Sequence, residues 1–267
     1  MSRISEKFQE LKRMNKKALI TFVTAGDPTI NGTIQIVKEL ERKGADIIEL
    51  GIPYSDPIAE GPVIQEANKR ALMNNIKIKD IMNMVKEIRR EVKVPLIYLL
   101  YYNCILQYGI ERFFRECTEC GIDGLIIPDL PYEELKEIED VSTKYENEID
   151  VITLVSPTSG DRIRRIAKKA RGFLYCVSSL GVTGERDNFS TDFNEFFSII
   201  NISTSIPKAI GFGISTPEHV RMLKEYSDGL IVGSAIVRRI GESPSIDEAV
   251  KNVGDFVAIL RKTIDEF

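Results

Sequence analysis

The amino-acid sequence predicts a single-domain (β/α)8 barrel over residues 1–267, and two observations lead to this prediction. Short apolar runs rich in β-branched residues alternate with longer amphipathic segments along the chain, as in successive βα units. Eight such runs occur in 267 residues, and barrels of this kind commonly contain about 250 residues. Because no linker, charge block or low-complexity segment divides the chain, we expect one domain.

Each expected strand is a run of mostly apolar residues. The runs cover residues 18–25, 46–51, 95–102, 124–128, 150–155, 172–178, 207–211 and 229–233. Between them, apolar residues recur at helical spacing, as Ile81, Val85 and Ile88 do, and Thr216 before Pro217 is a typical helix start. Eight strands that each lead into a helix can close into a barrel.

An open, doubly wound sheet is the alternative architecture. Its usual mark is a Gly-x-Gly-x-x-Gly turn after the first strand. The first run instead ends in Ala25-Gly26-Asp27-Pro28, so we favour the barrel. Catalytic groups of barrels come from the carboxyl ends of the strands and the loops that follow them, so candidate residues are sought there.

Composition and charge argue against several classes of function. Lys and Arg total 36 against 40 Asp and Glu, a net charge of −4, which gives no electrostatic reason to expect a nucleic-acid partner. No apolar run is long enough to span a membrane, and the start of the chain is charged where a signal peptide needs an apolar core. We expect a soluble, cytoplasmic protein with a small ligand.

The four cysteines, Cys104, Cys117, Cys120 and Cys176, are too few for a disulfide scaffold, so we expect reduced thiols. Cys117 and Cys120 form a Cys-x-x-Cys motif. They also continue the apolar face of a helical pattern, and this packing role is favoured over redox chemistry.

Two carboxylates mark the end of the second expected strand. Glu49 lies within the strand and Glu60 in the following loop. Alternation along a strand puts Ile47, Glu49 and Gly51 on one face. If this face points into the barrel, burial would raise the pKa of Glu49 and suit it to proton transfer near neutral pH. Spacing alone equally allows an acid that is paired with a Lys or Arg.

Glycines cluster at the ends of the sixth, seventh and eighth expected strands, in segments 181–184, 211–215 and 233–235. Glycine lets backbone N–H groups approach an anion closely, and loops seven and eight of a barrel are a frequent phosphate site. Any one of these glycines could simply form a tight turn. Together they favour a phosphorylated substrate.

The sequence lacks the residues that two other kinds of barrel enzyme, a metal-dependent epimerase and a Schiff-base aldolase, would need. The only histidine, His219, lies inside a helical pattern, whereas a metal-dependent epimerase on this scaffold would need several His ligands, so we expect no metal site. A Schiff-base aldolase would need a lysine inside a strand. Lys208 lies at the wrong end of the seventh strand.

Six segments, 21–28, 49–57, 101–103, 123–131, 181–184 and 211–215, resemble the signature segments of tryptophan synthase alpha subunits in the same order and at near-identical spacing. The similarity extends from near residue 8 to the end of the chain. It implies retro-aldol cleavage of indole-3-glycerol phosphate, without a cofactor in this chain. Indole would pass through a tunnel to a beta subunit that carries pyridoxal phosphate, in an α2β2 heterotetramer.

The resemblance also implies roles for individual residues. Glu49 would be the general acid and base, and the Glu60 carboxylate would face the indole N–H. The implied substrate contacts are Phe22, Leu100, Tyr102, Ile127, Tyr175, Thr183, Phe212 and Val232. The implied phosphate contacts are Gly184, Gly213, Gly233 and Ser234, and Pro53, Asp56 and Pro57 would contact the beta subunit. The polar segment 185–192 is expected to be a mobile lid.

The sequence departs from the family pattern at two positions that follow these segments, Glu60 and Cys104. Aspartate is usual where Glu60 stands, and a misplacement of about 1 Å can cost on the order of 100-fold in rate, so we expect a compensating shift of the loop. Cys104 stands where proline is common and should loosen its loop. A free-standing lyase, or a weakly catalytic activator of the beta subunit, are the alternative functions.

Overall fold

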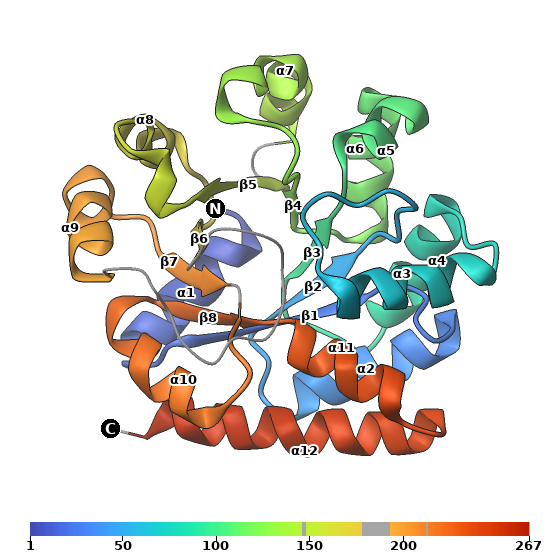
Figure 1. The fold of residues 1–267 in the computed structure, drawn as a ribbon. Coiled ribbons are helices and arrows are strands. Elements are labelled where there is room, and N and C mark those ends of the chain that lie inside the picture. Colours follow the sequence, from blue (N-terminus) through green and yellow to red (C-terminus); the bar gives the residue numbers. More distant parts are fainter. Residues whose placement is uncertain (146–147, 178–192, 212, 267) are drawn as a thin grey trace.

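Eight parallel strands form a closed barrel, in which each strand pairs with the next and β8 pairs with β1 (Figure 1). The computed structural model describes residues 1–145, 148–177, 193–211 and 213–266. The strands are β1 (Ala18–Thr24), β2 (Ile47–Gly51), β3 (Leu96–Leu99), β4 (Gly124–Ile126), β5 (Asp150–Val155), β6 (Leu174–Val177), β7 (Lys208–Gly211) and β8 (Gly229–Val232). Each lies within a predicted run, so the barrel prediction is confirmed.

Helices surround the barrel, and some connections contain more than one. They are α1 (Arg3–Arg13), α2 (Ile30–Arg42), α3 (Pro62–Met73), α4 (Ile78–Ile88), α5 (Tyr102–Tyr108), α6 (Ile110–Cys120), α7 (Lys136–Lys144), α8 (Arg162–Lys169), α9 (Phe193–Ser203), α10 (Pro217–Leu223), α11 (Ser234–Glu242) and α12 (Ile246–Asp265). Short 3-10 helices cover Tyr132–Glu134, Pro157–Ser159 and Lys224–Tyr226. Helix α1 precedes the first strand, and β2, β3 and β8 are each followed by two α-helices.

Side chains of the strands alternate between two apolar layers. The inner layer fills the barrel and includes Ile20, Ile47, Ile97 and Ile126, all fully buried. The outward-facing residues pack beneath the surrounding helices in a second, larger cluster. Because the period of a strand is two residues, a position along the sequence decides which layer a side chain enters.

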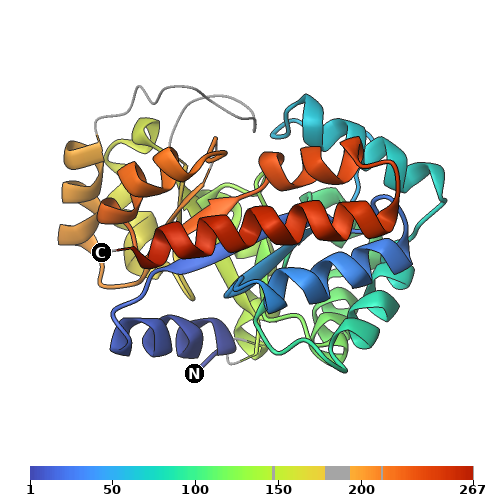
Figure 2. The ribbon, with the colours of Figure 1, turned by 90° about the horizontal axis from the view of Figure 1, so that it is seen from below.

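Helix α1 closes the lower end of the barrel, away from the carboxyl ends of the strands (Figure 2). Its apolar residues Phe8 and Leu11 are buried in the inner layer. The ring of Phe8 lies 5.6 Å from that of Phe173, which in turn lies 6.5 Å from Tyr175. Access to the inside of the barrel is therefore from the opposite end.

At the lower end of the barrel, three aspartates of the described residues make the same pattern of hydrogen bonds. Asp46, Asp123 and Asp228 each precede a strand, and each bonds the backbone at or near the start of the preceding strand. Asp123 illustrates the pattern: its N–H donates to the carbonyl of Leu96 at 2.8 Å, and its carboxylate accepts the Leu96 N–H at 2.8 Å. Asp46 bonds Leu19 in the same way, and Asp228 bonds Lys208. These pairs fix strand register where the helices connect.

The cysteines behave as packing residues. Cys117 and Cys120 are buried on α6 within the outer apolar layer, and all four cysteines are free thiols. In the part of the chain that the structure describes, no helix combines the length and hydrophobicity needed to cross a membrane.

Candidate active site

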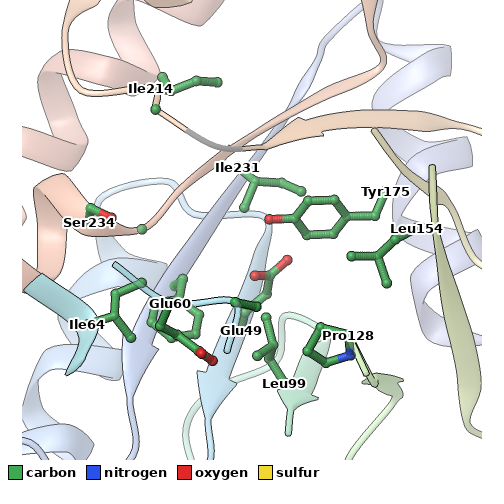
Figure 3. A pocket seen from close by; sticks show the side chains of 14 residues that line it. Glu49, Glu60, Ile64, Leu99, Pro128, Leu154, Tyr175, Ile214, Ile231 and Ser234 are labelled. Atoms are coloured by element: carbon green, nitrogen blue, oxygen red, sulfur yellow. The ribbon is translucent and has the colours of Figure 1, made fainter. Parts of the chain in front are cut away.

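A cavity opens at the carboxyl ends of the strands, where a barrel enzyme carries its site (Figure 3). It is lined by Phe22, Glu49, Ala59, Glu60, Ile64, Leu99, Pro128, Leu154, Tyr175, Gly213, Ile214, Ile231, Gly233 and Ser234. The lining is mostly apolar, with two carboxylates and one glycine-rich side. Such a mixture suits a small ligand that has an apolar body and a polar end.

Glu49 projects from β2 into this cavity, on the inner face as alternation predicts (Figure 3). Its side chain is buried, and Oε1 has no hydrogen-bond partner among the described residues. Loss of solvent raises the pKa of Glu49 to about 8. The carboxyl group is therefore mainly protonated at neutral pH and is poised to give a proton and take one back. An ordinary ion pair would lower this pKa instead.

Two aromatic rings flank Glu49 because glycines on adjacent strands leave space for them. A Cβ at Gly51 would overlap the ring of Phe22, and a Cβ at Gly211 would overlap the hydroxyl group of Tyr175. The pKa of the Tyr175 hydroxyl is raised well above its ordinary value, mainly by burial and also by the nearby Glu49 charge. Tyr175 consequently stays a neutral phenol beside the acid.

Glu60 reaches the cavity from the end of the β2–α3 loop and is held there by Tyr101. The Tyr101 hydroxyl donates to Glu60 Oε2, and the hydroxyl oxygen of Tyr101 accepts the N–H groups of Ile58 at 2.8 Å and Ala59 at 2.9 Å. The Tyr101 ring stacks on Tyr54, with centroids 4.8 Å apart. One side chain from the end of β3 thus fixes both the carboxylate and its loop. Sequence analysis missed Tyr101.

Burial is the main cause that raises the pKa of Glu60, whereas the hydrogen bond from Tyr101 opposes it. Replacing Tyr101 by Phe should therefore raise the pKa of Glu60 and move the low-pH limit of activity to higher pH. A hydrogen bond to a charged group contributes about 1.5–3 kcal/mol, so we expect kcat/KM to fall by at least about tenfold.

A pH profile of kcat/KM for Tyr101→Phe checks this expectation. Tyr102→Phe is the matched control, because the Tyr102 hydroxyl donates to Glu137 at 2.7 Å on the protein surface. The control should keep the wild-type profile. An unshifted profile in Tyr101→Phe would contradict the role assigned to its hydroxyl.

The opposite side of the lining is suited to an anion. Gly233 is the N-cap of α11, no side chain caps this helix, and Ser234 follows as its first residue. The first N–H groups of a helix have no partner within the helix and attract negative charge. Gly213, with φ 91°, lines the same side. This conformation favours glycine and brings backbone close to a ligand.

Three predicted wall residues lie elsewhere. Leu100, Ile127 and Val232 are buried in the outer layer beneath the helices, so these predictions are wrong. The physical reason is strand alternation, which the sequence analysis applied to the second strand only. Neighbouring residues face the cavity instead, and these are Leu99, Pro128 and Ile231.

The prediction for Tyr102 is also wrong, because strand β3 ends at Leu99 rather than continuing to residue 102. Tyr102 begins α5, its N–H donates to Asp129 at 2.8 Å, and its hydroxyl points to the surface. Thr183, Gly184, Phe212 and the expected lid 185–192 lie outside the described residues. Their roles stay predictions.

The loop predicted to contact a partner is partly exposed. Asp56 is exposed and Pro57 half-buried, but Pro53 is buried and cannot itself offer a contact surface in this conformation. Ile58 lies beside them with 73% of its surface exposed. This large exposed apolar side chain, which the sequence analysis did not single out, is a better candidate than Pro53. His219 is buried on α10, away from the cavity lining.

The fold and the cavity together define a class of protein: a barrel enzyme that moves protons inside an apolar cavity and holds an anionic small molecule. Comparisons with known proteins narrow this class. The model of the family described as "Tryptophan synthase alpha chain" matches residues 8–264. The chain therefore belongs to the tryptophan synthase alpha chain family.

Similar proteins and solved structures support the same family assignment. The tryptophan synthase alpha chain of Caldanaerobacter subterraneus subsp. tengcongensis is 54% identical over 264 residues, which cover 99% of this chain and all of the relative. Tryptophan synthase subunit alpha of Legionella pneumophila has a TM-score of 0.89 at 36% identity, with both chains covered completely. A Mycobacterium tuberculosis tryptophan synthase structure gives 0.90 at 30% identity, covering 100% of this chain and 99% of that chain.

As a member of this family, the chain is a lyase that cleaves indole-3-glycerol phosphate into indole and glyceraldehyde 3-phosphate, within the biosynthesis of tryptophan. The prediction that the resemblance supplied is confirmed at the level of family and activity.

Proposed function

We propose that Glu49 carries both proton transfers of the cleavage, with Glu60 as its partner carboxylate. The observation that supports this most strongly is the buried carboxyl group of Glu49, whose Oε1 has no hydrogen-bond partner among the described residues and whose pKa is raised to about 8. A buried carboxyl oxygen without a partner costs stability unless a function retains it. Proton transfer to an apolar ring is such a function.

One carboxyl group suffices because the proton that Glu49 gives to the indole ring is replaced by a proton from the glycerol hydroxyl group. Protonated Glu49 adds its proton to C3 of the indole ring, which weakens the bond from C3 to the glycerol chain. The Glu49 carboxylate then accepts the proton of the hydroxyl group on the adjacent glycerol carbon as that bond breaks. Indole and the aldehyde leave, and Glu49 is again protonated. Each transfer of this type contributes about 10²–10⁴-fold to the rate.

Glu60 serves the other end of the ring. Positive charge builds on the indole nitrogen once C3 is protonated, and the Glu60 carboxylate stabilises it by accepting the N–H hydrogen bond. Tyr101 favours the ionised form of Glu60, as this role requires. Phe22, Leu99 and Ile231 provide apolar contacts with the ring, while Gly213, Gly233 and Ser234 hold the phosphate. The separated polar ends suit one elongated substrate.

The longer side chain of Glu60 is matched to Tyr101. Shortening it in Glu60→Asp withdraws the carboxylate by one methylene and breaks the Tyr101 hydrogen bond. We expect kcat to fall by about tenfold to 100-fold, since a misplacement of about 1 Å has that effect. Steady-state kinetics of the variant check this. A gain in rate from the shorter acid would show that the loop has not adapted to glutamate.

The finer points of assembly are also proposals. We propose that the exposed loop at Asp56, Pro57 and Ile58 binds a beta subunit in an α2β2 heterotetramer, and that indole passes to it directly. The pyridoxal phosphate cofactor would belong to that beta subunit, since this chain's part needs only proton transfers. The four free thiols fit the reducing cytoplasm, where we expect the enzyme to work.

A coupled assay of glyceraldehyde 3-phosphate release from indole-3-glycerol phosphate tests the function, run with and without purified beta subunit. We expect turnover in the complex within ordinary enzyme rates of about 1–1,000 per second. Strong activation by the beta subunit supports the assembly, and equal rates without it would favour a free-standing lyase. Absence of turnover in the complex would favour a non-catalytic activator.

A further inference from the structure

An ion pair outside the cavity joins the loop after β1 to α3 and lies against α11, with the Asp27 side chain buried and the Arg70 side chain 34% exposed. The carboxylate of Asp27, in the loop after β1, has no exposed surface and accepts two hydrogen bonds from Arg70 on α3, each 2.8 Å long. Gly241 on α11 lies against the same guanidinium group, since a Cβ there would be 2.9 Å from Nη2. The loop, α3 and α11 therefore meet at one contact.

Each of these elements contributes to the cavity. Strand β1 carries Phe22, α3 starts at Pro62, two residues after Glu60, and carries Ile64 in its first turn, and α11 starts at Ser234. The ion pair thus lies near the carboxyl ends of α3 and α11, whose amino ends carry Ile64 and Ser234 of the cavity lining. It touches neither ligand position itself.

The loop after β1 is also packed closely onto the carboxyl end of α3. Asn74 Nδ2 donates to the carbonyl of Pro28 at 2.9 Å. Gly26 has φ 88°, and a Cβ there would overlap Ile76. Helix α3 cannot slide or rotate without breaking these contacts together with the Asp27–Arg70 pair.

A charged pair is a costly way to obtain stability alone. Burial raises the pKa of Asp27 and is only opposed by the hydrogen bonds and charge of Arg70. Replacement of buried ion pairs by apolar residues of similar volume is often neutral or stabilising. A bidentate pair of planar groups differs from an apolar contact because it fixes a distance and an angle.

We propose that Asp27 and Arg70 are positioning residues that set the distance between Glu60 and the amino end of α11. They hold α3, and through it Glu60, so that the carboxylate meets the indole nitrogen as positive charge builds there while the phosphate stays bound. The inference rests on the proposed function. It deepens that function by naming the residues that keep Glu60 at a fixed distance from the anion site.

The test replaces the pair by apolar residues in Asp27→Leu/Arg70→Met, which leaves no lone buried charge. We expect kcat to fall about tenfold to 100-fold, because small misplacements far from the chemistry have such effects. The KM for indole-3-glycerol phosphate and the Kd for glycerol 3-phosphate should each stay within about threefold, as expected when ground-state binding is kept. Arg70→Lys keeps the positive charge but loses the planar group that donates two hydrogen bonds, and it should give an intermediate kcat.

The matched control is Glu116→Leu/Arg112→Met, which removes a part-buried ion pair of 2.8 Å within α6, away from the cavity lining. It should lower stability but leave kcat within about twofold of wild type. Hydrogen–deuterium exchange gives a readout that needs no activity. Amides 58–61 should exchange faster in Asp27→Leu/Arg70→Met, while those of β2 should not.

Three results would overturn the inference: an unchanged kcat in Asp27→Leu/Arg70→Met, an equal loss in the control pair, or unchanged exchange at residues 58–61. Failure of the proposed function looks different, because wild type itself would then not cleave the substrate. The exchange measurement still decides the positioning role in that case.

Discussion

Replacing Glu49 by Gln is expected to lower kcat for cleavage of indole-3-glycerol phosphate by about 10³–10⁴-fold, because one residue supplies both proton transfers. The amide has nearly the same shape as the carboxyl group but cannot donate a proton to carbon and then take one from oxygen. Since Oε1 has no partner among the described residues, the substitution breaks no hydrogen bond at that atom. The fold should be retained.

Glyceraldehyde 3-phosphate release in the presence of beta subunit measures this loss. Binding of glycerol 3-phosphate, which probes only the anion site, is the internal control and should stay within about twofold of wild type. Residual activity above about one tenth of wild type would be too high for a general acid and base. Loss of phosphate binding would instead mean that the variant is disrupted.

The second large effect is expected on stability, at the lower end of the barrel. Asp123 is buried and accepts hydrogen bonds from Arg89 and from the Leu96 N–H. The Asp123→Ala variant leaves the Arg89 guanidinium, whose side chain is only 12% exposed, without its carboxylate. Breaking such a buried pair should lower the free energy of unfolding by about 3–5 kcal/mol.

Denaturant unfolding of Asp123→Ala and Asp228→Ala separates the contribution of the backbone hydrogen bonds from that of the pairing with the buried Arg89 guanidinium. Asp228 makes the same hydrogen bonds to the backbone of Lys208, but its side chain is 45% exposed. Its loss should therefore cost only about 1–2 kcal/mol. Equal effects at both positions would show that the buried guanidinium contributes nothing, contrary to the account given for Asp123.

Sequence reasoning located the strands because each is a short apolar run, and burial on both faces of a barrel strand requires such runs. It located Glu49 because alternation from Ile47 to Gly51 decides the face once one member is known to point inward. The same rule would have predicted Leu99 instead of Leu100 as a wall residue, but only if the end of strand β3 had been known. The extent of a strand depends on pairing with its neighbours, which a single run does not reveal.

Other features depend on contacts between distant parts of the chain. Tyr101 and Glu60 are 41 positions apart, and no local pattern relates the end of one strand to the loop after another. The pair of Asp27 and Arg70 is similarly invisible, since each residue alone looks like an ordinary surface charge. Burial and orientation, which arise only on folding, turn these residues into parts of a site.

The central claim is that the Glu49 carboxyl group is neutral at physiological pH and carries the proton of the reaction. Infrared difference spectroscopy can follow the carbonyl stretch of protonated carboxyl groups in wild type and in Glu49→Gln as pH is raised. The account predicts a band in wild type that disappears near pH 8 and is absent from Glu49→Gln. A Glu49 band lost near the ordinary glutamate pKa of about 4.3 would contradict the claim.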